Sequence, residues 1–260
     1  MEIRKVLAVY KKGKLPEHFK TIEVIKGILD KKQIKHKFVL KDDLKPQHFK
    51  DVDLVLSVGG DGTFLEASHF IKNDMPLLGI NSDVKTSEGH LTSADRFDFE
   101  KKIQSILDGK FKIEKRTRLE ARLDSKKIPL VLNDVYIGED VHYKASRYIL
   151  KFNGMEEEQK NSGILISTGS GSTAWYKSAG GKPFSKTAKE ARFIVREPYR
   201  GRLTKCTICT GKLKDEVMQI ISKMYNGCIA VDSFKVFNFE RGDTVRIKVS
   251  DKPLHTVVFC

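Results

Sequence analysis

Short apolar runs alternate with helical patterns along the N-terminal part of the chain. Four runs have the length and composition of buried strands, at residues 3–10, 36–40, 51–58 and 76–81. Apolar residues between positions 22 and 29 recur at helical spacing behind Pro16. Two more helices are predicted, from Phe64 to about residue 72 and over 99–107, the second ending at a Gly109 C-cap signal. Strands that alternate with helices predict a parallel, doubly wound sheet.

The pattern changes after residue 98, and we place a domain boundary there. Strand-like segments separated by turns now follow one another, at residues 111–123, 129–138, 145–153, 163–167, 203–209, 228–231, 235–239 and 244–249. We therefore predict an α/β domain over residues 1–98 and a β-rich, sandwich-like domain over residues 99–260.

The third predicted strand runs directly into the sequence GGDGT at residues 59–63. Three residues of this turn lack side chains, Gly59, Gly60 and Gly62. Backbone N–H groups can therefore approach a bulky anion there, and a following helix N-terminus attracts phosphate. Asp61 can take a proton or bind a metal, but either Asp61 or Thr63 could also simply cap the helix.

A second glycine cluster follows the strand that ends near Ser167. Residues 167–175 read STGSGSTAW, so two glycines separate five hydroxyl side chains before Trp175. Such a loop offers hydroxyl and amide groups to a polyhydroxylated or phosphorylated ligand, and Trp175 can stack on a flat ring. A polar turn with Trp175 as core filler fits equally well. The loop also matches G-x-G-x-x-A, but its β-rich flanks do not form the βαβ unit of a dinucleotide fold.

Polar side chains at three other positions could join these clusters. Asn81 ends the fourth predicted strand, at the sheet edge where ligands bind in parallel folds. Asn133 and Asp134 interrupt an apolar strand, where they could hold ribose hydroxyls or mark a strand edge or bulge. His90 follows Asn81 and brings an imidazole toward the first glycine turn, although a hydrogen-bonded structural histidine is the simpler interpretation.

The charge of the chain favours anionic small molecules over nucleic acid. The chain carries 48 basic and 34 acidic residues, a formal charge of +14. A basic surface attracts polyanions, but the lysines are dispersed and no zinc-finger, RNP-like or basic-zipper motif accompanies them. We therefore expect a solvated basic surface with a preference for phosphate ligands and no nucleic-acid partner.

Four cysteines, at positions 206, 209, 228 and 260, are expected to be reduced and partly buried. The lone C-x-x-C of Cys206 and Cys209 would need two further ligands to hold zinc, and on a regular strand the two side chains would point to opposite faces. No apolar stretch approaches the roughly 20 residues of a membrane span, and the N-terminus predicts a strand and not a targeting segment. We therefore expect a soluble cytoplasmic protein without a membrane partner.

The two glycine clusters and the pair between them together resemble the NAD kinase family. GGDGT at residues 59–63 matches a family motif that lipid kinases share. Residues 167–175 resemble the second family motif, STPTGSTAY, and Asn133–Asp134 match a family Asn-Glu/Asp pair. Val231–Asp232 match a later V-D motif. The resemblance covers most of the chain in matching order, and the G-T-G-N-D signature of the lipid kinases is missing.

Several details are similar to the branch that contains the mitochondrial-type NAD kinase of animals. The long loop over residues 79–91, Gly169 in place of proline, Trp175 in place of tyrosine, and Arg196-Glu-Pro198 all carry this similarity. Two positions depart from the wider family. Ser162 stands where most bacterial members have an NAD-holding aspartate, and His90 stands where many have an aromatic that stacks on a ring.

The resemblance implies phosphoryl transfer from ATP, or from polyphosphate, to the 2′-hydroxyl of the adenosine ribose of NAD, giving NADP. It implies that Asp61 accepts the proton of that hydroxyl or aligns it. It implies Mg²⁺ that binds with the phosphate donor, and no residue is predicted as a metal ligand of its own. The implied phosphate- or nucleotide-binding residues are Gly59, Gly60, Gly62, Thr63, Leu65, Asn81 and His90. The implied NAD-binding residues are Asn133, Asp134, Ser170, Thr173, Ala174, Trp175 and Ser178.

The family architecture implies a site in the cleft between the two domains and a homodimer or homotetramer. It also implies that the last 12 or so residues can return to the N-terminal domain. Two other functions fit parts of the pattern. A lipid or sphingoid kinase would share GGDGT but needs an apolar slot in place of the hydroxyl-rich loop. A non-catalytic NAD(P)-binding module would fit Ser162, whereas Asp61 and the complete glycine turn argue against it.

Overall fold

Two compact units make up the chain. The computed structural model describes residues 2–13, 15–85, 88–202 and 205–259. The first unit contains Met1–Lys115 together with Leu254–Cys260, and the second contains Arg116–Pro253. The boundary predicted at residue 98 is therefore too early. The helix after that position belongs to the first unit because its apolar side chains, Phe99, Ile103 and Ile106, are fully buried in the core of that unit.

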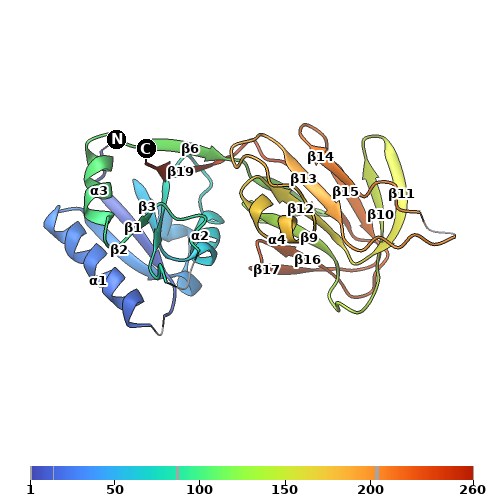
Figure 1. The fold of residues 1–260 in the computed structure, drawn as a ribbon, viewed down its shortest axis with the longest axis horizontal. Coiled ribbons are helices and arrows are strands. Elements are labelled where there is room, and N and C mark those ends of the chain that lie inside the picture. The colour runs from blue at the N-terminus through green and yellow to red at the C-terminus, as the bar shows by residue number, and fades with distance from the viewer. Residues whose placement is uncertain (1, 14, 86–87, 203–204, 260) are drawn as a thin grey trace. The chain divides into compact units, whose positions relative to one another are not determined.

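A seven-stranded sheet forms the centre of the first unit (Figure 1). In sheet order its strands are β2 (Lys35–Leu40), β1 (Lys5–Tyr10), β3 (Leu54–Gly59), β4 (Leu77–Asn81), β19 (Leu254–Val258) and β6 (Lys112–Arg116), with β5 (Ala94–Asp95) beside β4. The pairs that join β2, β1, β3 and β4 are all parallel. The four strands predicted from the apolar runs are thus present and parallel.

Helices cover both faces of this sheet (Figure 1). On one face, α1 (Pro16–Lys31) and α3 (Phe99–Leu107) pack residues such as Ile25 against alternate residues of β1 and β3. On the other face lies α2 (Asp61–Ser68), whose Phe64 contacts β4 at Gly79. Short 3₁₀ turns, Lys41–Asp43 and Pro46–Phe49, connect β2 to β3. Strands that are buried on both faces explain the continuous apolar runs of the sequence.

The end of the described chain returns to the first unit. Strand β19 pairs with β4 in parallel, with Thr256 opposite Leu77, and lies between β4 and β6 in the sheet. The Thr256 hydroxyl donates to the carbonyl of Glu114 at 3.1 Å. In Figure 1 the dark red β19 lies among the strands of the N-terminal unit. The return begins at Leu254, so the second unit is a continuous segment inserted into the first.

The second unit consists of two six-stranded antiparallel sheets. One contains β11 (Met155–Asn161), β10 (Ser146–Phe152), β15 (Met218–Ser222), β18 (Thr244–Val249), β7 (Leu119–Leu123) and β8 (Lys126–Lys127). The other contains β14 (Thr210–Leu213), β13 (Ala191–Val195), β12 (Ile164–Thr168), β9 (Asp134–Glu139), β16 (Gly227–Val231) and β17 (Lys235–Phe239). Residues of both sheets share one apolar core, including Leu150, Phe193 and Ile247.

The strand predicted over residues 203–209 is wrong. Residues 203 and 204 lie outside the described residues, residues 205–209 are irregular, and the strand begins only at Thr210. The sulfurs of Cys206 and Cys209 accordingly lie 2.7 Å apart and do not point to opposite faces. Burial raises the pKa of the Cys206 thiol to about 12, so both its burial and its protonation agree with a reduced thiol. Cys260 lies outside the described residues.

No helix within residues 2–13, 15–85, 88–202 and 205–259 is long and apolar enough to cross a membrane.

Candidate active site

The glycine turn joins β3 to α2 in the first unit. Gly60 is the residue before the helix and has an extended backbone, with φ −108° and ψ −166°. The helix therefore starts at Asp61 and ends at Ser68, earlier at both ends than predicted. The residue at the cap position is Gly60, and no side chain of the described residues caps the helix, so the interpretation of Asp61 or Thr63 as the cap is wrong. Because no described side chain caps this helix start, its first backbone N–H groups can bind an anion.

The glycines of the turn have different structural roles. A Cβ atom on Gly59 would lie 2.2 Å from the Thr63 hydroxyl oxygen, so the buried Thr63 side chain fills the space that Gly59 leaves. A Cβ atom on Gly62 would meet nothing within 4 Å, and Gly62 is exposed. Gly59 thus allows the turn to pack, whereas Gly62 leaves open space next to Asp61. Leu65, one turn further along α2, is buried at 7% exposure.

The Asp61 carboxylate is bound to the loop that follows β4. One oxygen accepts the backbone N–H of His90 at 3.1 Å, and the other accepts that of Leu91 at 2.8 Å. A carboxylate has about four lone-pair positions, so two are left for a ligand. The His90 ring is largely exposed, with its Nε2 2.7 Å from a Glu88 carboxylate oxygen. Among the described residues, His90 is bound to Asp61 through its backbone N–H.

Two glycines fix the position of this loop. A Cβ atom on Gly79 would lie 2.7 Å from the carbonyl oxygen of Leu91 and 2.8 Å from the Cα atom of Thr92. Gly89 has φ +65°, a conformation that favours glycine, and a Cβ atom there would lie 2.7 Å from the Asn81 amide nitrogen. Sequence reasoning missed these two positions, although a glycine inside a strand indicates a close backbone approach.

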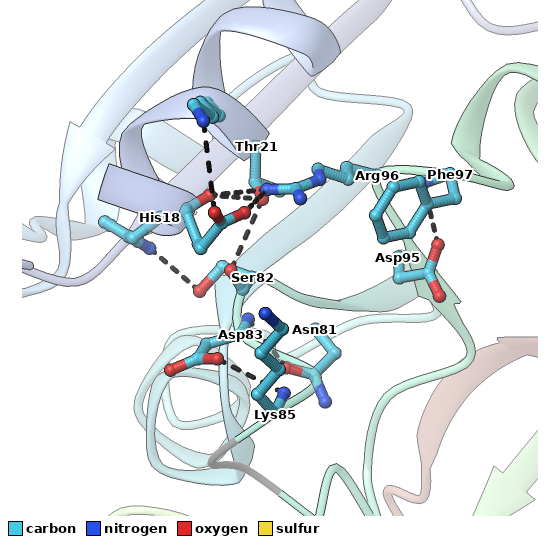
Figure 2. A network of polar contacts seen from close by, with 11 residues as sticks. His18, Thr21, Asn81, Ser82, Asp83, Lys85, Asp95, Arg96 and Phe97 are labelled. Carbon is cyan, nitrogen blue, oxygen red and sulfur yellow. Dashed lines mark hydrogen bonds and ion pairs between the residues drawn. The ribbon is translucent and has the colours of Figure 1, made fainter. Parts of the chain in front are cut away.

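Asn81 shapes the chain beyond β4. Its side-chain oxygen accepts the backbone N–H of Asp83 at 2.9 Å, and an Asp83 oxygen accepts that of Lys85 at 3.2 Å. Figure 2 shows these residues with Ser82, Thr21 and His18 at the end of β4. A small cavity of about 60 Å³ lies beside them. Residues 86 and 87 of the long loop lie outside the described residues.

In the second unit, Asn133 and Asp134 lie at the start of β9 and not inside a strand. The Asp232 carboxylate holds them there, because it accepts the backbone N–H groups of Leu132, Asn133 and Asp134 at 2.9, 2.7 and 3.1 Å. Asp232 is buried and has φ +49°. The aspartate of the V-D motif therefore fixes the backbone of residues 132–134. The sequence did not predict this role, because the residues in contact are about 100 positions apart.

The Asp134 carboxyl is buried close to the Asp232 charge. Burial first, and then the Asp232 carboxylate, raises the pKa of Asp134 to about 7. The carboxyl therefore gains or loses its proton near neutral pH. Its protonated form can donate a hydrogen bond as well as accept one.

The second glycine cluster packs closely on Asn133. A Cβ atom on Gly171 would lie 2.4 Å from the Asn133 carbonyl oxygen, and one on Gly169 would lie 2.0 Å from that of Ser185. The Thr168 N–H also donates to the Asn133 carbonyl at 2.9 Å. Both glycines therefore allow close packing against a neighbouring backbone carbonyl. We had expected them only to keep the loop open for a ligand.

Two buried oxygens in this part of the site have no hydrogen-bond partner among the described residues. They are Oδ1 of Asn133 and Oγ of Ser170. Buried polar atoms in proteins are nearly always paired, so two unpaired acceptors on adjoining segments indicate a place for ligand hydroxyls or N–H groups. They are the strongest indication of a binding site in the second unit.

Trp175 lies at the surface of the second unit and is only partly buried. The turn Gly171–Thr173 and the short helix α4 (Trp175–Ser178) carry this segment, in which Thr173, Ala174 and Ser178 are exposed. The Trp175 ring stacks on Tyr136, with centroids 5.2 Å apart and planes 26° apart, and the Arg196 guanidinium lies 5.4 Å from the ring. The interpretation as core filler is wrong. Tyr136, which sequence reasoning missed, also donates its hydroxyl to the Ser162 carbonyl.

No group of three or more His, Cys, Asp or Glu side chains that could hold a metal ion is present in the part of the chain that the structure describes. The zinc interpretation of Cys206 and Cys209 therefore has no further ligands among these residues.

Comparisons with known proteins agree with the motifs. The family model described as the ATP-NAD kinase N-terminal domain matches residues 5–111. A probable NADH kinase of Oryza sativa is 32% identical to the chain, over 93% of the chain and 81% of the rice protein. The fold is similar to that of an Archaeoglobus fulgidus NAD kinase crystallised with ATP, with a TM-score of 0.78 and 22% identity over 98% of this chain and 93% of that one. It is also similar to yeast NADH kinase crystallised with NADH, with a TM-score of 0.83 and 20% identity over 100% and 84% of the two chains.

Proposed function

The chain belongs to the NAD kinase family, and we propose that it transfers a phosphoryl group from ATP to the 2′-hydroxyl of the adenosine ribose of NAD or NADH. The product is NADP or NADPH. The lipid-kinase and binding-module alternatives have no support in the relatives. The observation that carries the proposal is the Asp61 carboxylate, which two backbone N–H groups hold at the start of α2 beside an open glycine turn.

Asp61 is the proposed catalytic residue. Its carboxylate would accept the proton of the attacking hydroxyl, or hold that hydroxyl in line with the donor phosphorus. The two N–H donors leave lone pairs free for this contact and fix the orientation of the carboxylate. Phosphoryl transfer depends mainly on such positioning, because the transition state needs little covalent help from the protein.

The glycine turn would hold the phosphates of the donor. No side chain in the described part of the chain caps the N–H groups at the start of α2, and a Cβ atom on Gly62 would meet nothing within 4 Å. We propose that Mg²⁺ binds together with the donor. Mg²⁺ commonly takes one or two carboxylates plus phosphate oxygens and water, which suits a site whose described residues form no three-ligand cluster. When bound, it would neutralise charge on the phosphates.

The second unit would hold the dinucleotide. The unpaired oxygens of Asn133 and Ser170 are suited to hydroxyl or amide donors, and Asp134 can accept from a ribose hydroxyl. Exposed Thr173, Ala174 and Ser178 would contact the same ligand. The Trp175–Tyr136 stack offers a flat surface for a ring. His90 and Ser162 differ from the residues of the wider family. We propose that they alter how tightly the nicotinamide and adenine ends of NAD are bound.

One assay tests the proposed function. The protein is incubated with ATP, Mg²⁺ and NAD or NADH, and the product is detected with a dehydrogenase specific for NADP. We expect NADP or NADPH that increases with time and with enzyme concentration. Tight binding of NAD without product would favour the binding module, and transfer to a sphingoid base or diacylglycerol would favour the lipid kinase. Replacing ATP by polyphosphate defines the donor range.

We also propose a cytoplasmic location and a homodimer or homotetramer, both from the sequence and the family resemblance. Membership of the mitochondrial-type branch is a proposal of the same kind. Light scattering behind a sizing column tests the oligomer, since a mass near 30 kDa, the mass of one chain, would contradict it.

A further inference from the structure

The strand order places the loop after β1 next to the glycine turn. In the order β2-β1-β3-β4, the chain moves outward from β1 to β2 on one side and from β3 to β4 on the other. The crossovers lie on opposite faces, α1 on one and α2 on the other (Figure 1). Such a reversal opens a crevice at the carboxyl ends of the two central strands. The register pairs Tyr10 with Val58 as the last pair of the two strands, so the loop after β1 starts at the level of the glycine turn.

Two lysines, Lys11 and Lys12, follow β1 at this point. Lys11 is half-buried and Lys12 is exposed, and neither forms an ion pair with another described residue. The lysine after β2 differs, because Lys41 lies 2.6 Å from a carboxylate oxygen of the buried Glu66. The loop at the carboxyl end of β1 therefore carries two lysines that form no ion pair with another described residue. It lies beside the glycine turn, whose backbone N–H groups suit phosphate.

Hydrogen bonds fix this loop relative to the glycine turn. The buried His18 ring is hydrogen-bonded to the Lys11 carbonyl through Nε2 at 2.8 Å. Its Nδ1 lies 2.8 Å from the Ser82 hydroxyl oxygen (Figure 2). The Ser82 N–H donates to the Gly59 carbonyl at 3.0 Å. The loops after β1, β4 and β3 are thus linked in one chain of contacts. A Cβ atom on Gly13 would lie 2.4 Å from the His18 ring, so the loop passes directly over it.

We propose that Lys11 and Lys12 bind the phosphate groups of the nucleotide donor in the crevice between β1 and β3. This inference rests on the proposed function and names two residues that neither the motifs nor the family resemblance assign. The lysines neutralise the donor phosphates from the β1 side, while the start of α2 binds them from the β3 side. His18 is a positioning residue that holds the lysine loop through the Lys11 carbonyl.

The test compares K11A, K12A and the double variant with K26A. Lys26 is an exposed, unpaired residue of α1, about 15 Å further along the helix from Pro16, so its charge is largely screened from the crevice. Initial rates are measured against ATP at saturating NAD, and against NAD at saturating ATP. We expect the KM for ATP to rise about tenfold in each single variant, and more in the double variant. The KM for NAD should stay within about twofold, and K11R and K12R should restore most of the ATP affinity.

Direct binding separates this inference from the proposed function. Calorimetry with Mg-ATP, and with inorganic tripolyphosphate, is run on the same variants without NAD. If the wild-type chain binds ATP but forms no NADP, the proposed function fails while the lysines are still tested. Binding by the double variant as tight as that by K26A overturns the inference, as does an equal rise in the KM values for ATP and NAD. Failure of the wild-type chain to bind either ligand overturns it as well. Thermal unfolding checks that each variant is folded.

Discussion

Asp61 has both carboxylate oxygens bound to backbone N–H groups, an arrangement that orients it without neutralising it. In Asp61→Asn, the amide can accept from one of these N–H groups but presents its own NH₂ to the other. We expect NADP formation to fall by about 10²- to 10⁴-fold because the proton acceptor is lost. NAD binding and thermal unfolding should change little, since Asp61 is not part of the core.

The dehydrogenase-coupled assay measures this loss, and NADH fluorescence measures binding. D215N serves as the control because Asp215 is an exposed carboxylate in the turn before β15. Turnover of D61N close to that of D215N would remove Asp61 from the mechanism.

Asp134 should make the stability of the protein depend on pH. Its pKa in the folded protein is raised to about 7, above the ordinary value near 3.8, so the folded state keeps a proton that the unfolded state loses. The contribution of this group to stability is therefore lost as pH rises from about 4 to about 7. Asp134→Asn cannot ionise, so its stability relative to wild type should increase between pH 5 and pH 8.5, by about 3 kcal/mol.

Urea unfolding of both proteins at the two pH values checks this expectation. Groups that do not interact with Asp134 titrate alike in wild type and variant, so the change in the stability difference between the two proteins reports on Asp134 and its coupling to Asp232. A difference that is the same at pH 5 and pH 8.5 would refute the raised pKa.

At the level of the elements, the close contact between β4 and the loop over residues 89–92 supports the active site. Gly79→Ala would place a methyl group against the backbone of Leu91 and Thr92, and this backbone cannot move aside as a flexible side chain could. We expect the loop to shift, and the N–H groups of His90 and Leu91 that donate to Asp61 to move with it. NADP formation should fall about tenfold or more, with a loss of about 1–3 kcal/mol in stability.

Gly27→Ala is the matched control for this change. Gly27 lies on α1 with nothing near its Cβ position, so alanine there should raise stability by about 0.5–1 kcal/mol and leave activity unchanged. Full activity of G79A would show that the Asp61 contacts to this loop are dispensable.

The elements of the first unit were predictable because their signals are local. Apolar runs buried on both faces give the parallel strands, and Gly109 marks the end of α3 with φ +73°. Strand β11 was not predicted, because three consecutive glutamates, Glu156, Glu157 and Glu158, interrupt the alternation of apolar and polar residues that indicates a strand. In the structure, the Glu157 carboxylate accepts the backbone N–H groups of residues 207 and 208. The domain boundary was misplaced because the packing of α3 depends on tertiary contacts.

The site was predictable in its residue types and not in its geometry. Glycines followed by a carboxylate indicate an anion site, whatever surrounds them. The contacts of Asp61 to residues 29 and 30 positions away, and of Asp232 to residues about 100 positions away, have no local signal. The Trp175–Tyr136 stack likewise depends on how β9 and α4 lie in space.

On the scale of the whole molecule, the insertion of the second unit makes the first depend on β19. Val257 is 1% exposed and belongs to the core of the first unit. Val257→Ala removes two buried methyl groups, which should destabilise that unit by about 2 kcal/mol. Native-state hydrogen exchange should report lower protection for amides of β4, with those of β10 in the second unit unchanged.

Val217→Ala is the control, because Val217 is 50% exposed and its loss should change protection by less than about 0.5 kcal/mol. An equal loss of protection in β4 and β10 would mean that the two units unfold together, contrary to their separate cores.

The late position of β19 also has a consequence for synthesis on the ribosome. Thr256 joins Glu114 across 142 positions of the chain. At about 5–20 residues per second, the ribosome needs roughly 7–28 s to travel that distance. During this time β4 has no partner on its β19 side, and an open strand edge invites pairing with other chains. Strand β18 of the second unit ends at Val249, only a few residues before β19 begins at Leu254. The N-terminal sheet, although translated first, therefore closes no earlier than the second unit is complete.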